Sequence, residues 1–205
     1  MHALIMAGGE GRRINLGEKP LVLICGRPMI AYITDAFIGA GIYPVVAASP
    51  KTPMTMNWCR AQCIEMVRTK GKGYIPDMIE AIKALDEQHP VFVSVSDLPC
   101  ITAEIIQSIV ESYAQSGKDA CSTWIPVQVV ESLRCSITYE EQICGIRACP
   151  TGINILRGSL IDQPQEEHRL LLYEPGLALN VNTRDDLAIA EKFLKHKSGV
   201  KSPGS

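Results

Sequence analysis

HALIMAGGEGRRINLGEKP, residues 2–20, predicts a buried strand that runs into a glycine-rich turn and then a group of cations. The apolar run at residues 3–6 is too short for a helix and is typical of a parallel strand covered on both faces. Gly8, Gly9 and Gly11 follow directly, and glycines let backbone N–H groups approach an anion closely. We therefore expect the sheet to be built around this strand and the chemistry to lie at its turn.

Three cations, Arg12, Arg13 and Lys19, stand within eight residues next to that turn. A loop of this composition can wrap a triphosphate and stabilise the charge that develops as a P–O bond breaks. The alternative is an ordinary tight turn with solvated cations. The glycines alone do not decide between the two.

Two familiar phosphate-binding motifs fail against this stretch. A dinucleotide fingerprint would need a third glycine where Ile14 stands, and an acid at the end of the second strand, where residues 47–49 are AAS. A Walker loop needs Gly-Lys followed by Ser or Thr, and residues 17–20 are GEKP. Neither motif describes the chain.

The composition predicts one globular domain. With 205 residues and 46% hydrophobic content, the chain can bury one substantial core, which we place in residues 1–197, with 198–205 as a disordered tail. The amino-terminal residues lack the profile of a secretory signal, and no apolar run reaches the ~18 residues of a membrane span, so we expect a cytoplasmic protein. A net charge of −2 argues against nucleic acid as a partner.

The cysteines and histidines do not form a recognisable metal motif. Eight cysteines match neither zinc-ribbon nor Cys-x-x-Cys spacing, so we expect most of them to be buried thiols. The four histidines are dispersed, and a histidine metal site is not expected.

Strand and helix patterns alternate along the chain, which predicts a three-layer α/β/α sandwich with a mostly parallel, Rossmann-like sheet. The expected helices begin after Pro28, after an N-cap at Thr52 and after an N-cap at Thr102. A β excursion is expected at residues 133–147, with its turn at 140–142, and a polar loop at 163–168. We expect strands at residues 43–48, 64–68, 90–96, 119–126 and 150–156, and helices at residues 29–40, 53–62, 77–85 and 103–116.

A second glycine cluster, TKGKGYIPD at residues 69–77, also falls between a strand and a helix. In an open α/β sheet, ligands bind where strands deliver their carboxyl ends. Gly71, Lys72 and Gly73 are therefore candidate ligand contacts. A flexible surface turn with a solvated lysine would have the same sequence pattern.

Asp97 directly follows the strand expected at residues 90–96. A carboxylate at the end of a buried strand is costly unless it faces solvent, a partner or a metal, although a helix-capping turn would also place it there. Gly152 and Asn154 are bare or polar positions in the apolar strand at residues 150–156, and such exceptions often mark close approach of a ligand.

The stretch LNVNTRDDL, residues 179–187, combines a structural and a functional signal. Thr183 and Asp186 form a plausible capping box for the final helix. Asn180 and Asn182 alternate with apolar residues at an expected strand end and have no such structural explanation.

The pattern Ala-Gly-Gly-x-Gly-x-Arg from Ala7, followed by Lys19-Pro20, resembles the signature of nucleotidyltransferases that attach an NMP to a phosphorylated acceptor. Together with TKGKGYIPD, PTGIN and NVNTRDDL, it resembles the archaeal GTP:adenosylcobinamide-phosphate guanylyltransferases over nearly the whole chain. The first and last blocks are shared with molybdenum-cofactor guanylyltransferases. One departure is Arg12, which stands where many members have Thr or Ser.

The resemblance implies a nucleotide-diphospho-sugar-transferase-like fold and a role for each matched residue. Arg13 and Lys19 would stabilise the phosphates as catalytic residues, while Asp97, also catalytic, and Asn182 would hold Mg²⁺. Tyr74 and Asn154 would contact the acceptor, although Tyr74 and Lys72 are candidates for the guanosine as well. The implied nucleotide-binding residues are Ala7, Gly8, Gly9, Gly11, Arg12, Gly71, Lys72, Gly73, Gly152 and Asn180.

The implied reaction is transfer of GMP from GTP to a phosphorylated corrinoid, with release of pyrophosphate. Guanylyl or cytidylyl transfer to molybdopterin or another phosphorylated small molecule is the enzymatic alternative, and a nucleotide-sensing module is the non-enzymatic one. A homodimer is possible through the β excursion. All of these readings require the amino-terminal turn, Asp97 and the two late asparagines to converge at one rim of the sheet.

Overall fold

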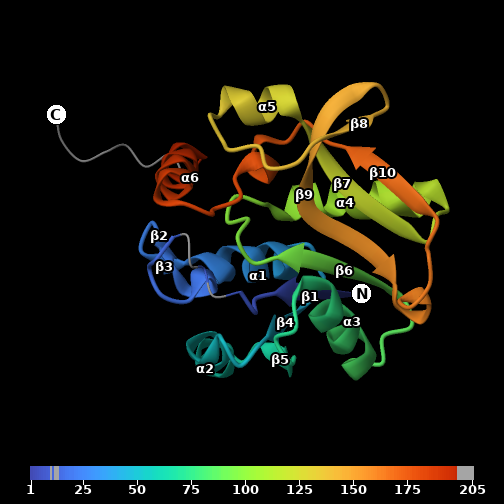
Figure 1. Cartoon of the computed structure of the whole chain (residues 1–205), viewed down its shortest axis with the longest axis horizontal. Coiled ribbons are helices and arrows are strands. Elements are labelled where there is room, and N and C mark those ends of the chain that lie inside the picture. Colours follow the sequence, from blue (N-terminus) through green and yellow to red (C-terminus); the bar gives the residue numbers. More distant parts are fainter. Residues whose placement is uncertain (10, 12–13, 198–205) are drawn as a thin grey trace.

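The computed structural model describes residues 1–9, 11 and 14–197, and it is a layered α/β structure (Figure 1). Arg12, Arg13 and the expected tail at 198–205 lie outside the described residues. The strands are β1 (His2–Met6), β2 (Leu23–Ile24), β3 (Arg27–Pro28), β4 (Tyr43–Ala48), β5 (Glu65–Arg68), β6 (Pro90–Val95), β7 (Ala120–Pro126), β8 (Glu141–Ile143), β9 (Ile146–Arg157) and β10 (Glu167–Leu171). The helices are α1 (Met29–Gly39), α2 (Pro53–Ala61), α3 (Tyr74–Ala84), α4 (Ala103–Ser116), α5 (Val127–Ser132) and α6 (Arg184–Lys197), with 3-10 turns η1 (Lys19–Leu21), η2 (Gly158–Leu160) and η3 (Pro175–Ala178).

The main sheet of the described chain has the order β10-β7-β9-β6-β1-β4-β5, with β8 added alongside β9. Strand β1 pairs in parallel with β4 and β6, and β5 in parallel with β4. The long strand β9 is antiparallel to both neighbours, β6 and β7. Met6 lies opposite Ala47 on one side and Val95 on the other, so these strands end together at one edge. This mostly parallel sheet confirms the expected fold class.

Helices cover the two faces of the sheet unequally. Helices α1, α2 and α4 pack on one face, where Phe37 and Phe92 meet edge to face with ring centroids 5.4 Å apart. Helix α3 packs on the other face, over β1, β4 and β5, through Met78, Ala81 and Ile82. Burial of these apolar side chains is the main term that stabilises the layers. Among the described helices, none is long and apolar enough to cross a membrane.

A third apolar cluster joins segments that are far apart in the sequence. Ile14, Val22 and Ile24 pack with Leu179, Val181 and Ala190 of the carboxyl-terminal region. Helix α6 therefore lies beside β2 and β3, as Figure 1 shows. This cluster holds the residues after the first glycine turn close to those that precede α6.

Several boundaries differ from those expected. The excursion turns at Cys144 and Gly145 instead of residues 140–142, because both adopt positive φ, 50° and 80°, the left-handed conformation of a tight hairpin turn. One strand, β9, then runs through the expected strand at 150–156. Part of the expected loop at 163–168 pairs with β7 as β10, and no strand forms around Asn180.

Candidate functional site

A cleft of about 550 Å³ opens at the carboxyl edge of β1, β4, β5 and β6. Its volume lies within the range of about 300–1,000 Å³ that small-molecule sites occupy. The predicted residues that line it are Gly8, Gly9, Gly11, Lys19, Gly71, Gly73, Tyr74 and Asp97. The unpredicted ones are Met6, Lys51, Asp77, Val95 and Ser96. The two glycine loops thus face one cavity.

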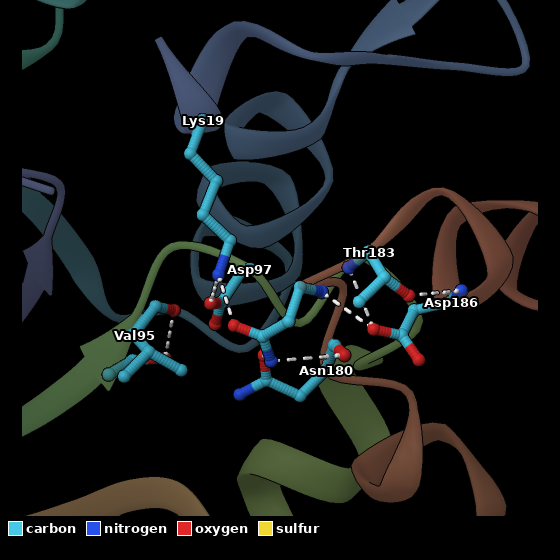
Figure 2. A network of polar contacts seen from close by, with 8 residues as sticks. Lys19, Val95, Asp97, Asn180, Thr183 and Asp186 are labelled. Atoms are coloured by element: carbon cyan, nitrogen blue, oxygen red, sulfur yellow. Dashed lines mark hydrogen bonds and ion pairs between the residues drawn. The ribbon is translucent and has the colours of Figure 1, made fainter. Parts of the chain in front are cut away.

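Lys19 joins the carboxylate after β6 to the amides before α6. Its Nζ donates to Asp97 Oδ2 and, at 2.8 Å, to Asn182 Oδ1 (Figure 2). The Asn182 side chain in turn donates from Nδ2 to Asn180 Oδ1 at 2.7 Å. That bond fixes the orientation of the Asn182 amide, so its oxygen faces Lys19. The three segments that the sequence predicted to converge therefore meet at one point.

The backbone holds this point rigidly. Asp186 Oδ2 accepts hydrogen bonds from the backbone N–H groups of Asn182 and Thr183, at 3.0 and 2.8 Å. Thr183 Oγ1 accepts from the N–H of Asp186 at 3.1 Å, which confirms the predicted capping box of α6. The N–H of Val181 also donates to Asp97 O at 2.9 Å. The capping box therefore also positions Asn182.

Lys19 itself is placed by two features of the first loop. Gly11 has φ +64°, and a Cβ there would lie 2.6 Å from Lys19 Cβ, so only glycine leaves room for the lysine. Glu18 accepts from Met54 N and Thr55 N, both at 2.7 Å, and from Thr55 Oγ1 at 2.6 Å. These bonds satisfy the free amides of the first turn of α2.

This arrangement corrects the expected cap of α2. Thr52 stands at the N-cap position, but its side chain makes no capping bond. Its hydroxyl bonds instead to the backbone of Ser49, and the carboxylate of Glu18 caps the helix. The helix start was predictable from Pro53, whereas its capping group comes from a distant loop.

Ser49, at the end of β4, connects the two glycine loops. Its hydroxyl donates to Gly8 O at 2.9 Å. Its Cβ would lie 3.4 Å from a Cβ built on Gly71 and 3.2 Å from one built on Gly8. Both loops therefore pack on one serine, with little room for a Cβ at Gly8 and ordinary contact for one at Gly71.

The carboxylate oxygen of Asp97 that Lys19 does not contact, Oδ1, suits a hard cation. Asp97 is 9% exposed, and its Oδ1 is buried without a hydrogen-bond partner among the described residues. Asn182 Oδ1 supplies a second oxygen nearby through Lys19. Mg²⁺ is typically held by one or two protein oxygens together with substrate phosphates. The described residues contain no group of three His, Cys, Asp or Glu side chains that could hold a metal without substrate.

Tyr74 contributes a hydroxyl that stays neutral. It is the first residue of α3, three residues before the expected start of that helix, and it lines the cleft. Burial, and to a smaller extent the charge of Asp97, raise the pKa of Tyr74 to about 12. At neutral pH it can only donate or accept a neutral hydrogen bond.

Some predicted site residues lie beside the cleft instead of lining it. A Cβ on Gly152 would lie 2.8 Å from Val95 Cγ2, so packing against β6 already explains this glycine. Asn154 pairs with Val93 and with Ser122 within the sheet. Asn180 and Asn182 line a smaller neighbouring cavity of about 130 Å³.

Two further predicted residues serve the loops mainly through their backbone. The N–H of Ala7 donates to Ala47 O at 2.8 Å, which extends the β1–β4 pairing up to the glycine turn. Lys72 is exposed, and its N–H donates to Asp77 Oδ1. Arg12 and Arg13, predicted to contact the nucleotide and its phosphates, lie outside the described residues.

Sequence reasoning missed three charged residues of the site and its surroundings, Glu18, Lys51 and Asp77. Asp77 was read only as the start of a helix, because acids are common in a first turn. Lys51 lies in a loop without a motif, and Glu18 shares its short stretch with Lys19. Of the three, only Glu18 had a signal in the sequence, because it directly precedes the predicted catalytic residue Lys19.

The model of the MobA-like NTP transferase domain matches residues 3–156. The adenosylcobinamide-phosphate guanylyltransferase of Methanocaldococcus jannaschii is 35% identical over 211 residues, covering 98% of this chain and all of the relative. The molybdenum cofactor guanylyltransferase of Desulfosudis oleivorans is 25% identical over 203 residues, covering 94% of this chain and 95% of the relative.

Among solved structures, a CMP:2-keto-3-deoxy-manno-octonic acid synthetase complexed with CTP superposes with a TM-score of 0.70 at 14% identity, covering 96% of this chain and all of that one. A hypothetical transferase from Thermus thermophilus gives a TM-score of 0.71 at 18% identity, covering 91% of this chain and all of that one. These two likenesses show the fold. The matched family model and the full-length relative show more: the chain belongs to the family of MobA-like NTP transferases and is a nucleotidyltransferase.

Proposed function

We propose that the chain transfers GMP from GTP to adenosylcobinamide phosphate, giving adenosylcobinamide-GDP and pyrophosphate. The observation that carries this proposal is the 35% identity to a guanylyltransferase of that name over the whole of both chains. A second observation supports it: one cleft is lined by Lys19, Asp97 and the two glycine loops, and it is large enough for a small-molecule substrate.

In the proposed reaction, a phosphate oxygen of the acceptor attacks the α-phosphorus of GTP. A new P–O bond forms there, the bond from the α-phosphorus to the bridging oxygen breaks, and pyrophosphate leaves with that oxygen. The protein forms no covalent bond, so its contribution is positioning and charge stabilisation.

The residues of the cleft divide this work. The ammonium of Lys19 has three N–H donors, of which Asp97 and Asn182 accept two, so a third is left for a phosphate oxygen. Gly8 and Gly9 let the backbone approach the phosphates, and a Cβ on Gly9 would meet no atom within 4 Å, so its side of the loop is open. Tyr74, which also lines the cleft, supplies a neutral donor.

Asp97 and Asn182 are the residues that would hold Mg²⁺. The ion, when bound, would neutralise charge on the phosphates at the α-phosphorus. Asp97 Oδ1, which has no partner among the described residues, is the oxygen that this role requires. Lys19 donates to the other oxygen of the carboxylate, Oδ2.

The remaining sequence-based roles belong to the same proposal. Arg12 and Arg13 would contact the triphosphate, the loop of Gly71, Lys72 and Gly73 would contact the nucleoside, and Asn180 would contact the nucleotide through its bond with Asn182. Gly152 and Asn154 would approach the ligands from the sheet. A homodimer stays a prediction, to be checked by sedimentation equilibrium.

The direct test incubates the protein with GTP, Mg²⁺ and adenosylcobinamide phosphate and identifies the product by mass. We expect adenosylcobinamide-GDP and an equal amount of pyrophosphate. Molybdopterin as acceptor and CTP as donor test the second candidate, which the 25% identity to a molybdenum cofactor guanylyltransferase favours. Pyrophosphate release with molybdopterin but not with the corrinoid would replace the proposal by that alternative, and GTP binding without turnover of any acceptor would indicate a nucleotide-sensing module.

The site assignment is tested in the same assay. We expect Lys19→Ala and Asp97→Ala each to lower turnover at least ~100-fold, judged from the size of single electrostatic contributions in active sites. The matched control is the exposed ion pair, 2.7 Å long, between Lys83 near the carboxyl end of α3 and Asp162 after η2. Alanine at either control residue should leave turnover unchanged. Folded Lys19 and Asp97 variants with normal rates would refute the assignment.

A further inference from the structure

Asp77 is a buried carboxylate in the cleft that the proposed mechanism does not use. It lies in the first turn of α3, is 6% exposed and lines the cavity. Its Oδ1 accepts a hydrogen bond from the N–H of Lys72 at 2.9 Å. No described residue donates to its Oδ2. Among the described residues, Asp97 Oδ1 is the one buried side-chain oxygen without a partner, so Asp77 Oδ2 keeps contact with the solvent of the cleft and is open to a ligand group that donates to it.

The position of Asp77 along the cleft indicates which part of a nucleotide it would meet. Lys19 and Asp97 mark the phosphate end, beside the first glycine loop. Ser49 connects that loop to Gly71, so the cleft continues from the phosphate end to the second loop. A triphosphate at Lys19 therefore leaves the nucleoside at the second loop, where Asp77 lies. A second phosphate contact at Asp77 is excluded by like-charge repulsion.

The chemistry of the bases then decides the partner. Guanine presents two neighbouring N–H donors on one edge, N1–H and the 2-amino group. Adenine has an acceptor at N1, cytosine an acceptor at N3, and uracil an N–H flanked by two carbonyl oxygens. An ionised carboxylate only accepts, so guanine alone among the four matches both of its oxygens. We infer that Asp77 selects guanine by accepting from N1–H and the 2-amino group, an inference that rests on the proposed function.

The backbone contact of Asp77 makes a specific substitution informative. In Asp77→Asn, the N–H of Lys72 needs an acceptor, so the amide oxygen takes the place of Oδ1 and the NH₂ group replaces Oδ2. The loop bond is kept, and the edge of the side chain now offers one acceptor and one donor. Xanthine, which carries N1–H and a carbonyl oxygen at position 2, matches that edge, and guanine no longer does. The substitution should therefore exchange one base for the other.

The experiment measures displacement of a fluorescent GTP analogue by GTP, ITP and XTP, together with kcat/KM where turnover occurs. ITP lacks the 2-amino group, so wild type should bind GTP about ten- to a hundredfold more tightly than ITP, the size of one hydrogen bond to a charged group. XTP should bind at least as weakly as ITP. Asp77→Asn should lose a similar factor for GTP and should prefer XTP to GTP.

The matched control is Glu80→Gln on the same helix. Glu80 Oε2 accepts from the N–H of Lys70 at 3.1 Å, so it supports the same loop without lining the cleft. Its substitution should leave the GTP:ITP:XTP ratios unchanged. A purely structural role of Asp77 would weaken all three nucleotides by one factor in Asp77→Asn, and that result would overturn the inference.

Failure of the inference is distinguishable from failure of the proposed function. Nucleotide displacement needs no acceptor, so base selectivity is measurable even if no corrinoid product forms. If Asp77→Asn does not fold, the wild-type ratios still decide, because equal binding of GTP, ITP and XTP excludes a carboxylate that reads N1–H and the 2-amino group. Turnover with GTP, combined with unchanged ratios in the folded variant, would keep the proposed function and reject the role of Asp77.

Discussion

Glu18→Ala should separate the positioning of Lys19 from the chemistry that Lys19 performs. Glu18 is bonded to the first turn of α2 through Met54 N, Thr55 N and Thr55 Oγ1, and Lys19 follows it directly. Removing the carboxylate detaches the loop from the helix and leaves the ammonium of Lys19 chemically intact. We expect a protein that still folds and still carries Asp97, but that catalyses poorly.

The size of the effect on stability follows from burial. Thr55 is fully buried and Met54 is 60% exposed, so the amide of Met54 can turn to water while both donors of Thr55 lose their acceptor. Each buried donor without a partner costs about 1–3 kcal/mol, so the two donors of Thr55 together give about 2–6 kcal/mol in the free energy of unfolding. For a chain of this length, that corresponds to a fall in Tm of about 4–24 °C.

The effect on catalysis follows from position. A displacement of the order of 1 Å in a catalytic group can cost about a hundredfold in rate, so we expect kcat/KM to fall between about ten- and a hundredfold. Pyrophosphate release is measured well below the Tm of the variant, and urea denaturation gives the stability separately. Thr55→Val is the control, because it removes one hydrogen bond, costs about 1 kcal/mol and leaves both amide contacts of Glu18 in place.

Two outcomes would contradict this reasoning. If Glu18→Ala is destabilised as expected but turns over GTP at the wild-type rate, Glu18 caps α2 without positioning Lys19. If Thr55→Val loses as much activity as Glu18→Ala, the loss comes from disturbing α2 and not from the loop that carries Lys19.

Three further predictions follow from the same geometry. Gly11→Ala should lower kcat/KM at least ~10-fold, because its Cβ would lie 2.6 Å from Lys19 Cβ. The control is Gly17→Ala, at φ +87° with no atom within 4 Å of the new Cβ, which should lower stability but not kcat/KM. Equal losses of kcat/KM in the two variants would show that the contact with Lys19 is unimportant. Burial raises the pKa of the Cys100 thiol from about 9 to about 12, so the unfolded chain loses this proton first and stability should fall by up to about 1.4 kcal/mol per pH unit between pH 9 and 12. In urea denaturation at those pH values, Cys100→Ala should lack this part of the slope, and parallel curves would contradict it. Chelation of divalent cations should abolish turnover and Mg²⁺ should restore it, while full activity in excess chelator would remove the proposed role of Asp97 and Asn182 as ligands.

The sequence predicted the parts of the fold in which local pattern and tertiary position agree. Strand β4 was expected at its observed bounds, Tyr43–Ala48, because a continuous run of apolar and β-branched residues is buried on both faces. The turn at Cys144 was missed because a left-handed cysteine has no compositional signal, while the polar residues at 140–142 looked like a turn. Strand β10, with the sequence EHRLL, lies at the edge of the sheet, where polar residues are tolerated and the apolar signal is weak.

The convergence of Lys19 and Asp97 was predictable because the parallel strands β1 and β6 deliver their carboxyl ends to one edge. Asn182, in contrast, follows no strand, and its segment is held there by the bond from Val181 N to Asp97 O. The partner that holds each group in place was not predictable. Glu18 caps a helix that begins 35 residues later, and nothing in either segment indicates the pairing. Asp77 has the sequence context of an ordinary helix start, and only the folded structure shows that it lines the cleft with one oxygen bonded to the N–H of Lys72.

The net charge of the cleft lining bears on how a nucleoside triphosphate would bind. Its described lining carries two lysines, Lys19 and Lys51, and two carboxylates, Asp77 and Asp97, so the lining contributes no net positive charge. A nucleoside triphosphate brings several negative charges, and Lys19 is already shared with Asp97 and Asn182. The lining alone therefore cannot neutralise the phosphates, which supports the proposed divalent cation on Asp97 and the proposed phosphate contacts of Arg12 and Arg13. Since these charges act at short range in a largely buried site, we expect nucleotide affinity to depend far more on Mg²⁺ than on ionic strength, which titrations of GTP at fixed salt with and without chelator would measure.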